Sequence, residues 1–192
     1  MITLERDRSA LLVMDFQSEV VTLFGERAAP ALGRAADLCA AARAAGVPIV
    51  YVAVGFRPGY PEVSPRNAAL ATLAQGGLLV ITGPDADLAP PLRAEPGEVV
   101  VIKRRVSAFA GTDLDMILRA KEIDTLVLSG IATSGVVLST VRHAADADYR
   151  LVVVEDACAD RDEEVHRVLM GKVFPRQATV TTTAEVVAAL GT

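Results

Sequence analysis

Residues 125–141, TLVLSGIATSGVVLSTV, contain the pattern that decides the fold. The mostly apolar run at 125–129 is typical of a strand that is covered on both faces. A glycine-containing loop follows at 130–136, and a helical pattern continues over residues 135–147. A buried strand that leads through a short loop into a helix is part of a βαβ unit, and such units build parallel sheets.

The same alternation of strand and helix patterns recurs along the chain. Further strands are predicted at residues 10–14, 48–54, 99–102, 150–154 and 178–181, and further helices at 30–45, 113–121, 163–171 and 184–190. We therefore expect an α/β fold in which a six-stranded parallel sheet lies between two layers of helices. With 192 residues, the chain is predicted to form a single domain, residues 1–192.

One stretch, residues 55–98, interrupts this rhythm. It holds seven of the ten prolines and six of the 14 glycines, with only a weak helical or strand signal at 68–81. Loops of this length in compact domains usually have a function. We expect this insertion to lie near the pocket.

Composition excludes several classes of function. The net charge is -5, and the basic residues are scattered apart from Lys103, Arg104 and Arg105, so no nucleic-acid surface is indicated. Ser, Gly and Thr interrupt the longest uncharged run, 125–141, which argues against a membrane span. The start of the chain has no apolar run long enough for a signal peptide. We expect a cytoplasmic protein that acts on a small molecule.

Metal and cofactor sites are not predicted. The two cysteines, Cys39 and Cys158, form no CxxC motif, and the two histidines are His143 and His166. This set does not build the usual four-ligand zinc site. We expect both histidines and both cysteines to serve packing, with a displaced catalytic thiol at Cys158 as the alternative.

Asp15, Lys103 and the loop at 130–136 each follow the carboxyl end of a predicted strand. Ligands of open parallel sheets bind at this edge. Burial and a neighbouring lysine can adjust a carboxylate for general acid or base work. The alternative is structural, with Asp15 capping a helix and Lys103 extending its ammonium to solvent.

Five segments together resemble the isochorismatase-like hydrolases, whose cysteine members include nicotinamidases and N-carbamoylsarcosine amidases. They are SALLVMDFQ (9–17), VIKRRVSAFAGTDLD (101–115), LVLSGIATSGVVLSTVRHA (126–144), VVVEDACAD (152–160) and FPRQATVTTTAEV (174–186). The resemblance implies that Asp15 and Lys103 belong to an Asp-Lys-Cys triad. It also implies a cis peptide between Ile131 and Ala132 that helps to shape an oxyanion hole, within a pocket loop formed by Ile131, Ala132, Thr133, Ser134 and Gly135.

The family's nucleophilic cysteine aligns with Val136, which cannot attack a carbonyl. True isochorismatases also lack this cysteine and hydrolyse a vinyl ether without a covalent intermediate. They carry a histidine and a tyrosine where this chain has Ala132, Thr133 and Ser134, so isochorismate itself is not the expected substrate. A replacement nucleophile at Ser134 is an alternative.

Gln17, Phe56, Arg57 and Arg105 are assigned to substrate binding. Phe56 and Arg57 follow the second strand, and Arg57 either clamps a carboxylate or lies exposed in the loop. The leading hypothesis is a small-molecule hydrolase that uses Asp15 as general acid or base and Lys103 as its electrostatic partner. The second hypothesis is a non-catalytic relative that binds a metabolite or serves an assembly. The family commonly forms dimers or tetramers, so we expect a homodimer or homotetramer.

Overall fold

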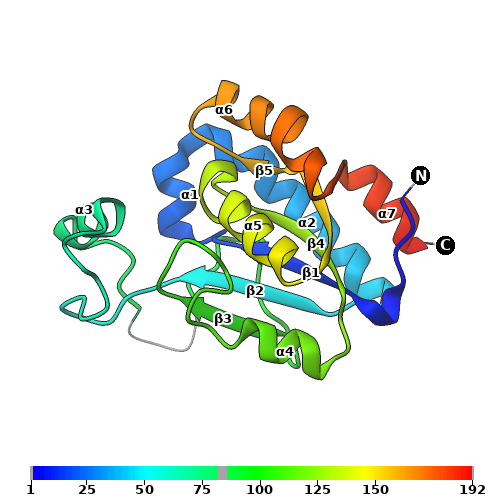
Figure 1. Ribbon diagram of the computed structural model, residues 1–192, viewed down its shortest axis with the longest axis horizontal. Helices are drawn as coiled ribbons and strands as arrows, with labels where there is room; N and C mark the ends of the chain where they lie inside the picture. Colours follow the sequence, from blue (N-terminus) through cyan, green and yellow to red (C-terminus); the bar gives the residue numbers. More distant parts are fainter. Residues whose placement is uncertain (1, 82–85, 192) are drawn as a thin grey trace.

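The computed structural model describes residues 2–81 and 86–191, and its strands form one parallel sheet (Figure 1). The strand order is β3-β2-β1-β4-β5-β6. The strands are β1 (Ser9–Met14), β2 (Ile49–Val54), β3 (Val99–Lys103), β4 (Thr125–Ile131), β5 (Arg150–Ala159) and β6 (Thr179–Thr181). The predicted α/β fold with a six-stranded parallel sheet is confirmed.

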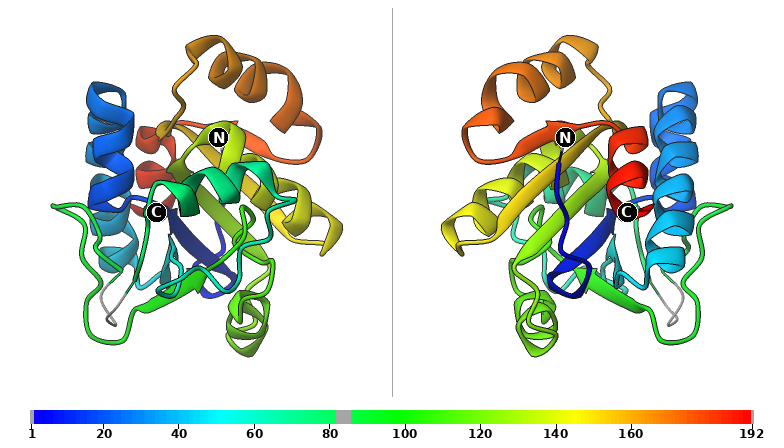
Figure 2. Two further views of the ribbon diagram at one scale, coloured as in Figure 1. Left: turned by 90° about the vertical axis from the view of Figure 1, so that its left-hand side faces the viewer. Right: turned by 90° about the vertical axis from the view of Figure 1, so that its right-hand side faces the viewer.

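Helices cover both faces of this sheet, with α2 and α7 on one face and α4 and α5 on the other (Figure 2). The α-helices are α1 (Ser18–Phe24), α2 (Ala28–Ala45), α3 (Ala68–Gln75), α4 (Leu114–Ala120), α5 (Leu138–Asp146), α6 (Glu163–Val168) and α7 (Thr183–Gly191). Among the described residues, none of the helices is both long enough and apolar enough to cross a bilayer.

Strand β1 explains why the strand segments read as continuous apolar runs. Its side chains alternate between two buried clusters, with Leu11 and Val13 in the cluster that includes α2 and α7. Leu12 and Met14 belong to the cluster that includes α4 and α5. Because successive side chains of a strand point to opposite faces, a strand with helices on both faces must be apolar at every position.

The loop after β4 differs from the predicted helix over 135–147. A π-helical turn at Thr133–Val137 comes first, and α5 begins only at Leu138. Strand β5 continues to Ala159, beyond the predicted end at 154. Its register with β4 shifts between Leu128 and Gly130 of β4, and the pairing of the two strands then resumes. The predictions placed both elements correctly, but they missed the irregular geometry next to the end of β4.

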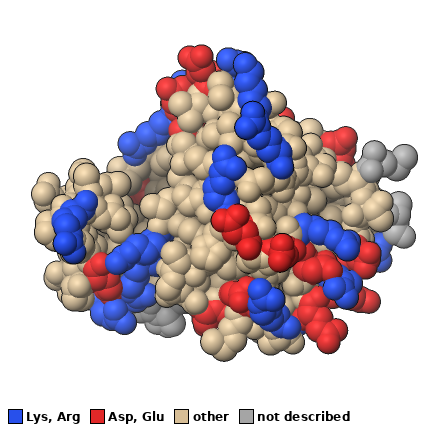
Figure 3. All heavy atoms as spheres, in the orientation of Figure 1, with Lys and Arg blue, Asp and Glu red and all other residues tan. Residues whose placement is uncertain are grey.

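The insertion at 55–98 contains α3, which projects from the body of the protein at the left of Figure 1 and forms the left-hand lobe of Figure 3. Asn67 caps this helix, since its side-chain oxygen accepts a hydrogen bond from the amide of Leu70 at 3.3 Å. Residues 82–85 of the insertion lie outside the described part of the chain. On either side of α3 the chain returns to the sheet, where Phe56 pairs with Val80.

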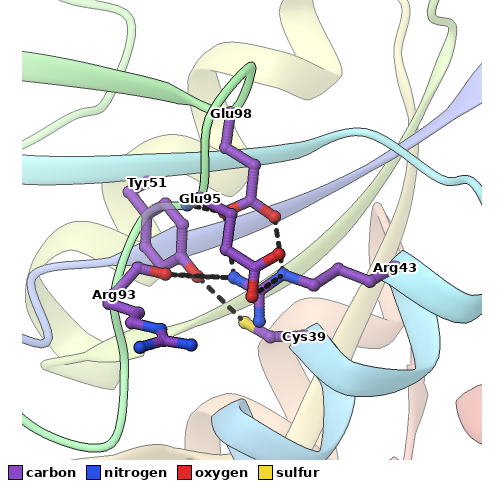
Figure 4. Close-up of polar contacts among 6 residues, drawn as sticks. All are labelled: Cys39, Arg43, Tyr51, Arg93, Glu95 and Glu98. Carbon is purple, nitrogen blue, oxygen red and sulfur yellow. Dashed lines mark hydrogen bonds and ion pairs between the residues drawn. The ribbon is translucent and has the colours of Figure 1, made fainter.

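A polar network fixes the second part of the insertion against β2 and α2 (Figure 4). The buried Tyr51 hydroxyl donates to the main-chain oxygen of Arg93 at 3.0 Å and receives a hydrogen bond from Arg43 Nη2 at 3.0 Å. The same guanidinium forks onto Glu98, with distances of 2.7 Å from Nε to Oε1 and 2.9 Å from Nη2 to Oε2. These contacts hold the chain that leads into β3.

Gly130 is a position at which the sheet requires glycine. A Cβ atom there would lie 2.9 Å from the main-chain oxygen of Met14 and 3.0 Å from its Cβ, on the neighbouring strand β1. We expect Gly130→Ala to lower the free energy of unfolding by about 1 to 3 kcal/mol, because the added methyl overpacks a buried strand pair. Urea denaturation measures this difference.

Gly33→Ala is the matched control. Gly33 lies on the exposed face of α2, and a Cβ there meets nothing within 4 Å. Alanine is the better helix former by about 1 kcal/mol, so this variant should be slightly more stable than the parent. Equal effects of the two substitutions would contradict the packing argument.

Candidate functional site

The carboxyl ends of the central strands converge where the direction of the chain through the sheet reverses. From β1 the chain proceeds outward through β2 and β3, and β4 then lies on the other side of β1. Such reversal points are where open α/β sheets bind ligands. Asp15 directly follows β1, and residues 132–137 directly follow β4 at the same edge.

Asp15 and Lys103 form a buried ion pair at this edge. Lys103 Nζ lies 2.8 Å from Asp15 Oδ2, and the two side chains are only 3% and 8% exposed. Lys103 ends β3 and is paired in register with Val54, so its side chain reaches past the end of β2 to β1. The predicted proximity of Asp15 and Lys103 is therefore present in the structure.

The backbone at Asp15 takes a left-handed conformation, with φ of 59°. Aspartate tolerates this region better than most residues, and such conformations concentrate at functional sites. Lys103 Nζ also donates to the main-chain oxygen of Arg105 at 3.1 Å, which fixes the ammonium from a second side. The pair is thus held by backbone geometry as well as by charge.

Burial raises the pKa of the Asp15 carboxyl, because removal from water disfavours the charged form. The Lys103 ammonium opposes this effect, and the net pKa shift is upward. The other carboxyl oxygen, Oδ1, is buried and has no hydrogen-bond partner among the described residues. A raised pKa and an unused oxygen are properties of a group that can hold and deliver a proton.

Two of the assigned substrate-binding residues are engaged within the protein. The amide of Gln17 donates to the Val54 oxygen at 3.0 Å and accepts from the Val54 amide at 2.9 Å. Its side chain therefore extends the hydrogen bonding of β2 beside Asp15. Phe56 is buried and lies against the Tyr60 ring, with ring centroids 5.7 Å apart.

Arg57 and Arg105 both contact Glu62, through different atoms. Arg57 is exposed and forms an ion pair with the Glu62 carboxylate. Arg105 does not contact that carboxylate. Instead, it donates to the main-chain oxygen of Glu62 at 3.1 Å and to that of Arg104 at 2.5 Å.

The pocket loop has an unusual backbone. The peptide bond between Ile131 and Ala132 is cis. The Ala132 oxygen then accepts hydrogen bonds from the amides of Gly135 at 3.1 Å and Val137 at 3.2 Å. The amide of Ser134 donates to Asp160 Oδ2 at 2.7 Å, so the chain after β5 helps to fix this loop.

His166 is a residue whose contact with the site was not predicted. It was expected to pack, but its Nδ1 lies 2.8 Å from the hydroxyl of Thr133, which is fully buried in the pocket loop. His166 belongs to α6, the helix that follows β5, and lies seven residues beyond the last residue of that strand, Ala159. The only sequence signal is its position on the helix after β5, which the sheet order places beside β4.

Val136 is buried in the apolar cluster beneath α4 and α5. Cys39 and Cys158 are buried as well, and neither forms a disulfide. Burial raises the pKa of the Cys158 thiol to about 12, which keeps it protonated at neutral pH. Residues 2–81 and 86–191 contain no cluster of three His, Cys, Asp or Glu side chains that could hold a metal ion.

Comparison with known proteins supports the resemblance seen in the sequence. The model of the isochorismatase domain matches residues 9–185. The chain belongs to the isochorismatase family. It is 34% identical to the isochorismatase family protein YecD of Escherichia coli O157:H7, over 99% of this chain and 100% of that protein.

Some of the proteins that this chain resembles are named as enzymes. The chain is 35% identical to the ureidoacrylate amidohydrolase RutB of Pseudomonas savastanoi pv. phaseolicola, over 78% of this chain and 69% of that protein. A cysteine hydrolase from Pseudomonas syringae pv. phaseolicola 1448A superposes with a TM-score of 0.90 at 26% identity, covering 100% and 96% of the two chains. The N-carbamoylsarcosine amidase of Thermoplasma acidophilum gives 0.77 at 31% identity, covering 92% and 96%.

We expect His166→Ala to destabilise the protein by about 1 to 3 kcal/mol, since the buried Thr133 hydroxyl loses its partner. His166→Asn, whose amide can reach the position of Nδ1, should restore part of that loss. Thr133→Val combined with His166→Ala should cost less than the sum of the single effects, as measured by urea denaturation. Strict additivity would show that the contact does not contribute to stability.

The buried, protonated thiols should be inert. Iodoacetamide should leave Cys39 and Cys158 unmodified in the native protein and alkylate both after unfolding, as read by mass spectrometry. A Cys39→Ala/Cys158→Ala variant should keep any hydrolytic activity of the parent. Rapid alkylation of Cys158 with loss of activity would instead favour a displaced cysteine nucleophile.

Proposed function

We propose that the chain is a hydrolase of small molecules that works without a covalent intermediate. Asp15 acts as the general acid and Lys103 as its electrostatic partner. The bond cleaved is a vinyl ether or a related C–O or C–N bond. The single observation that carries the proposal is the buried pair itself, with Nζ 2.8 Å from Oδ2 and Oδ1 without a partner among residues 2–81 and 86–191.

For a vinyl ether the chemistry follows from these two groups. The protonated Asp15 carboxyl delivers its proton to the terminal carbon of the enol ether, which leaves an oxocarbenium ion. Lys103 stabilises the carboxylate that forms. Water adds to the cationic carbon and returns a proton to Asp15, and the resulting hemiketal separates into a ketone and an alcohol. No step requires a thiol.

Hydrolysis of a C–N bond is the second candidate, and the names of the amidohydrolase and amidase relatives favour it. Val136 stands where the family's nucleophile aligns, so in this case water would attack directly. Asp15 would then serve as general base and take the proton of that water. The two candidates differ in the product released and in the protonation state of Asp15 that is active.

The first experiment compares the parent with Asp15→Asn on isochorismate, chorismate, simple vinyl ethers and a panel of small amides, with ketone and ammonia release measured. We expect Asp15→Asn to lower kcat/KM by about 10²- to 10⁴-fold, the usual contribution of general acid–base catalysis. Asp37→Asn, an exposed change on α2, is the matched control and should leave activity unchanged. Circular dichroism verifies folding.

Turnover that survives in Asp15→Asn would exclude the proposed mechanism. Absence of turnover in the parent on every substrate, together with saturable binding of a metabolite, would favour a non-catalytic relative of the family.

The pH profile distinguishes the two candidates. A general acid must be protonated, so kcat/KM should fall as pH rises through the pKa of Asp15. Burial raises that pKa above the usual range and thereby extends the active range upward. A general base must be ionised, so activity should fall as pH decreases through the same pKa. A profile that is identical in Asp15→Asn and the parent would exclude both roles.

A further inference from the structure

Two arginines of the insertion and the two arginines that directly follow β3 form a basic group. They are Arg57, Arg66, Arg104 and Arg105, and Glu62 is the acidic residue that contacts three of them. Figure 3 shows the blue side chains on and beneath the lobe that carries α3, at its left, with little red among them. The whole protein has a net charge of -5, so this basic group is a local exception.

Glu62 neutralises only part of this charge. Its Oε1 atom receives Arg104 Nε at 2.8 Å and also pairs with Arg57. One carboxylate therefore serves two guanidinium groups. Hydrogen bonds and ion pairs lower the Glu62 pKa and outweigh its burial, so Glu62 supplies one negative charge to the two guanidinium groups.

Arg105 and Arg66 lack a carboxylate partner in the part of the chain that the structure describes. The Arg105 guanidinium is instead positioned by two neutral main-chain oxygens, at 2.5 Å and 3.1 Å. A guanidinium has five N–H donors in a planar fork, so those two contacts leave donors free. Arg105 is thus oriented and still carries its full charge.

Both arginines line one hollow of about 460 Å³. Its lining comprises Ser64, Arg66, Asn67, Ala68, Leu70 and Arg105. The hollow is linked to the candidate site through the chain itself, since the main-chain oxygen of Arg105 receives Lys103 Nζ at 3.1 Å. Arg105 therefore contacts the hollow with its side chain and the Lys103 ammonium with its main-chain oxygen.

We infer that this hollow binds an anionic group of the substrate, a carboxylate or a phosphate, through Arg105 and Arg66. The inference rests on the proposed function and names its substrate class: a small molecule with an anionic group beside its hydrolysable bond. Guanidinium groups suit this task because their parallel donors match two oxygens of one anion. Unneutralised positive charge in a hollow also concentrates anions there.

Isothermal titration with malonate tests the inference without requiring turnover. Malonamide is the neutral probe of the same shape, and inorganic phosphate distinguishes the two anion chemistries. We expect malonate or phosphate to bind the parent and malonamide not to bind. Arg105→Gln and Arg66→Gln should each weaken binding by at least tenfold, and added salt should weaken binding to the parent.

Arg150→Gln is the control for net charge. Arg150 is an exposed arginine that begins β5 at the opposite edge of the sheet, so its loss should leave anion binding unchanged. Because Arg105→Gln also removes two hydrogen bonds to the backbone, thermal unfolding is measured for each variant. Arg66→Gln removes no guanidinium contact within the described chain and keeps the test valid if Arg105→Gln unfolds.

The inference would be overturned if Arg150→Gln weakened anion binding as much as the other two substitutions. It would also be overturned if Arg66→Gln or Arg105→Gln left anion binding unchanged. Absence of anion binding to the parent would also overturn it. Asp15→Asn separates this result from the proposed function. Anion binding that persists in this variant while turnover is lost supports both ideas, whereas turnover without anion binding removes only the anion site.

Discussion

The buried ion pair of Asp15 and Lys103 constrains the rest of the structure. Both ions lose hydration on folding, and breaking such a pair by removing one partner commonly costs about 3 to 5 kcal/mol. The lysine comes from the outermost strand and the aspartate from a central one, with β2 between them. The pair can form only if β3, β2 and β1 run parallel in this order and their carboxyl ends are aligned across the sheet. The pairing of Val54 with Lys103 aligns the ends of β2 and β3.

Much of the fold was predictable because its information is local. Continuous apolar runs give buried parallel strands, and α2 buries Ala31, Ala35, Leu38 and Ala42 at helical spacing. Helix α1 was missed because distant contacts fix its place. Glu19 accepts a hydrogen bond from the Leu79 amide at 3.0 Å, and the Ser18 amide donates to the Asp87 oxygen at 2.8 Å. Single-sequence patterns do not contain such pairings.

The sequence predicted those parts of the candidate site that lie at strand ends, but not their contacts with distant residues. Asp15, Lys103 and the loop of 131–135 could be named because each directly follows a strand, and strand ends meet at one edge. The contact of His166 with Thr133 could not be predicted, because α6 reaches the loop only through the path of β5. The hydrogen-bond and ion-pair partners of individual side chains could not be predicted either. Nothing in the sequence indicates that Gln17 pairs with Val54, or that Arg57 rather than Arg105 pairs with the Glu62 carboxylate.

The two attachments of the insertion separate the segment around α3 from the pair of Asp15 and Lys103. One attachment pairs Phe56 with Val80, and the other combines the bridge from Gln17 to Leu88 with the Tyr51 network. The residues between Phe56 and Val80 carry α3 and most of the hollow's lining. Lengthening a loop whose base is closed costs little entropy. Evolution or engineering can therefore exchange the segment around α3 while the pair of Asp15 and Lys103 stays where it is.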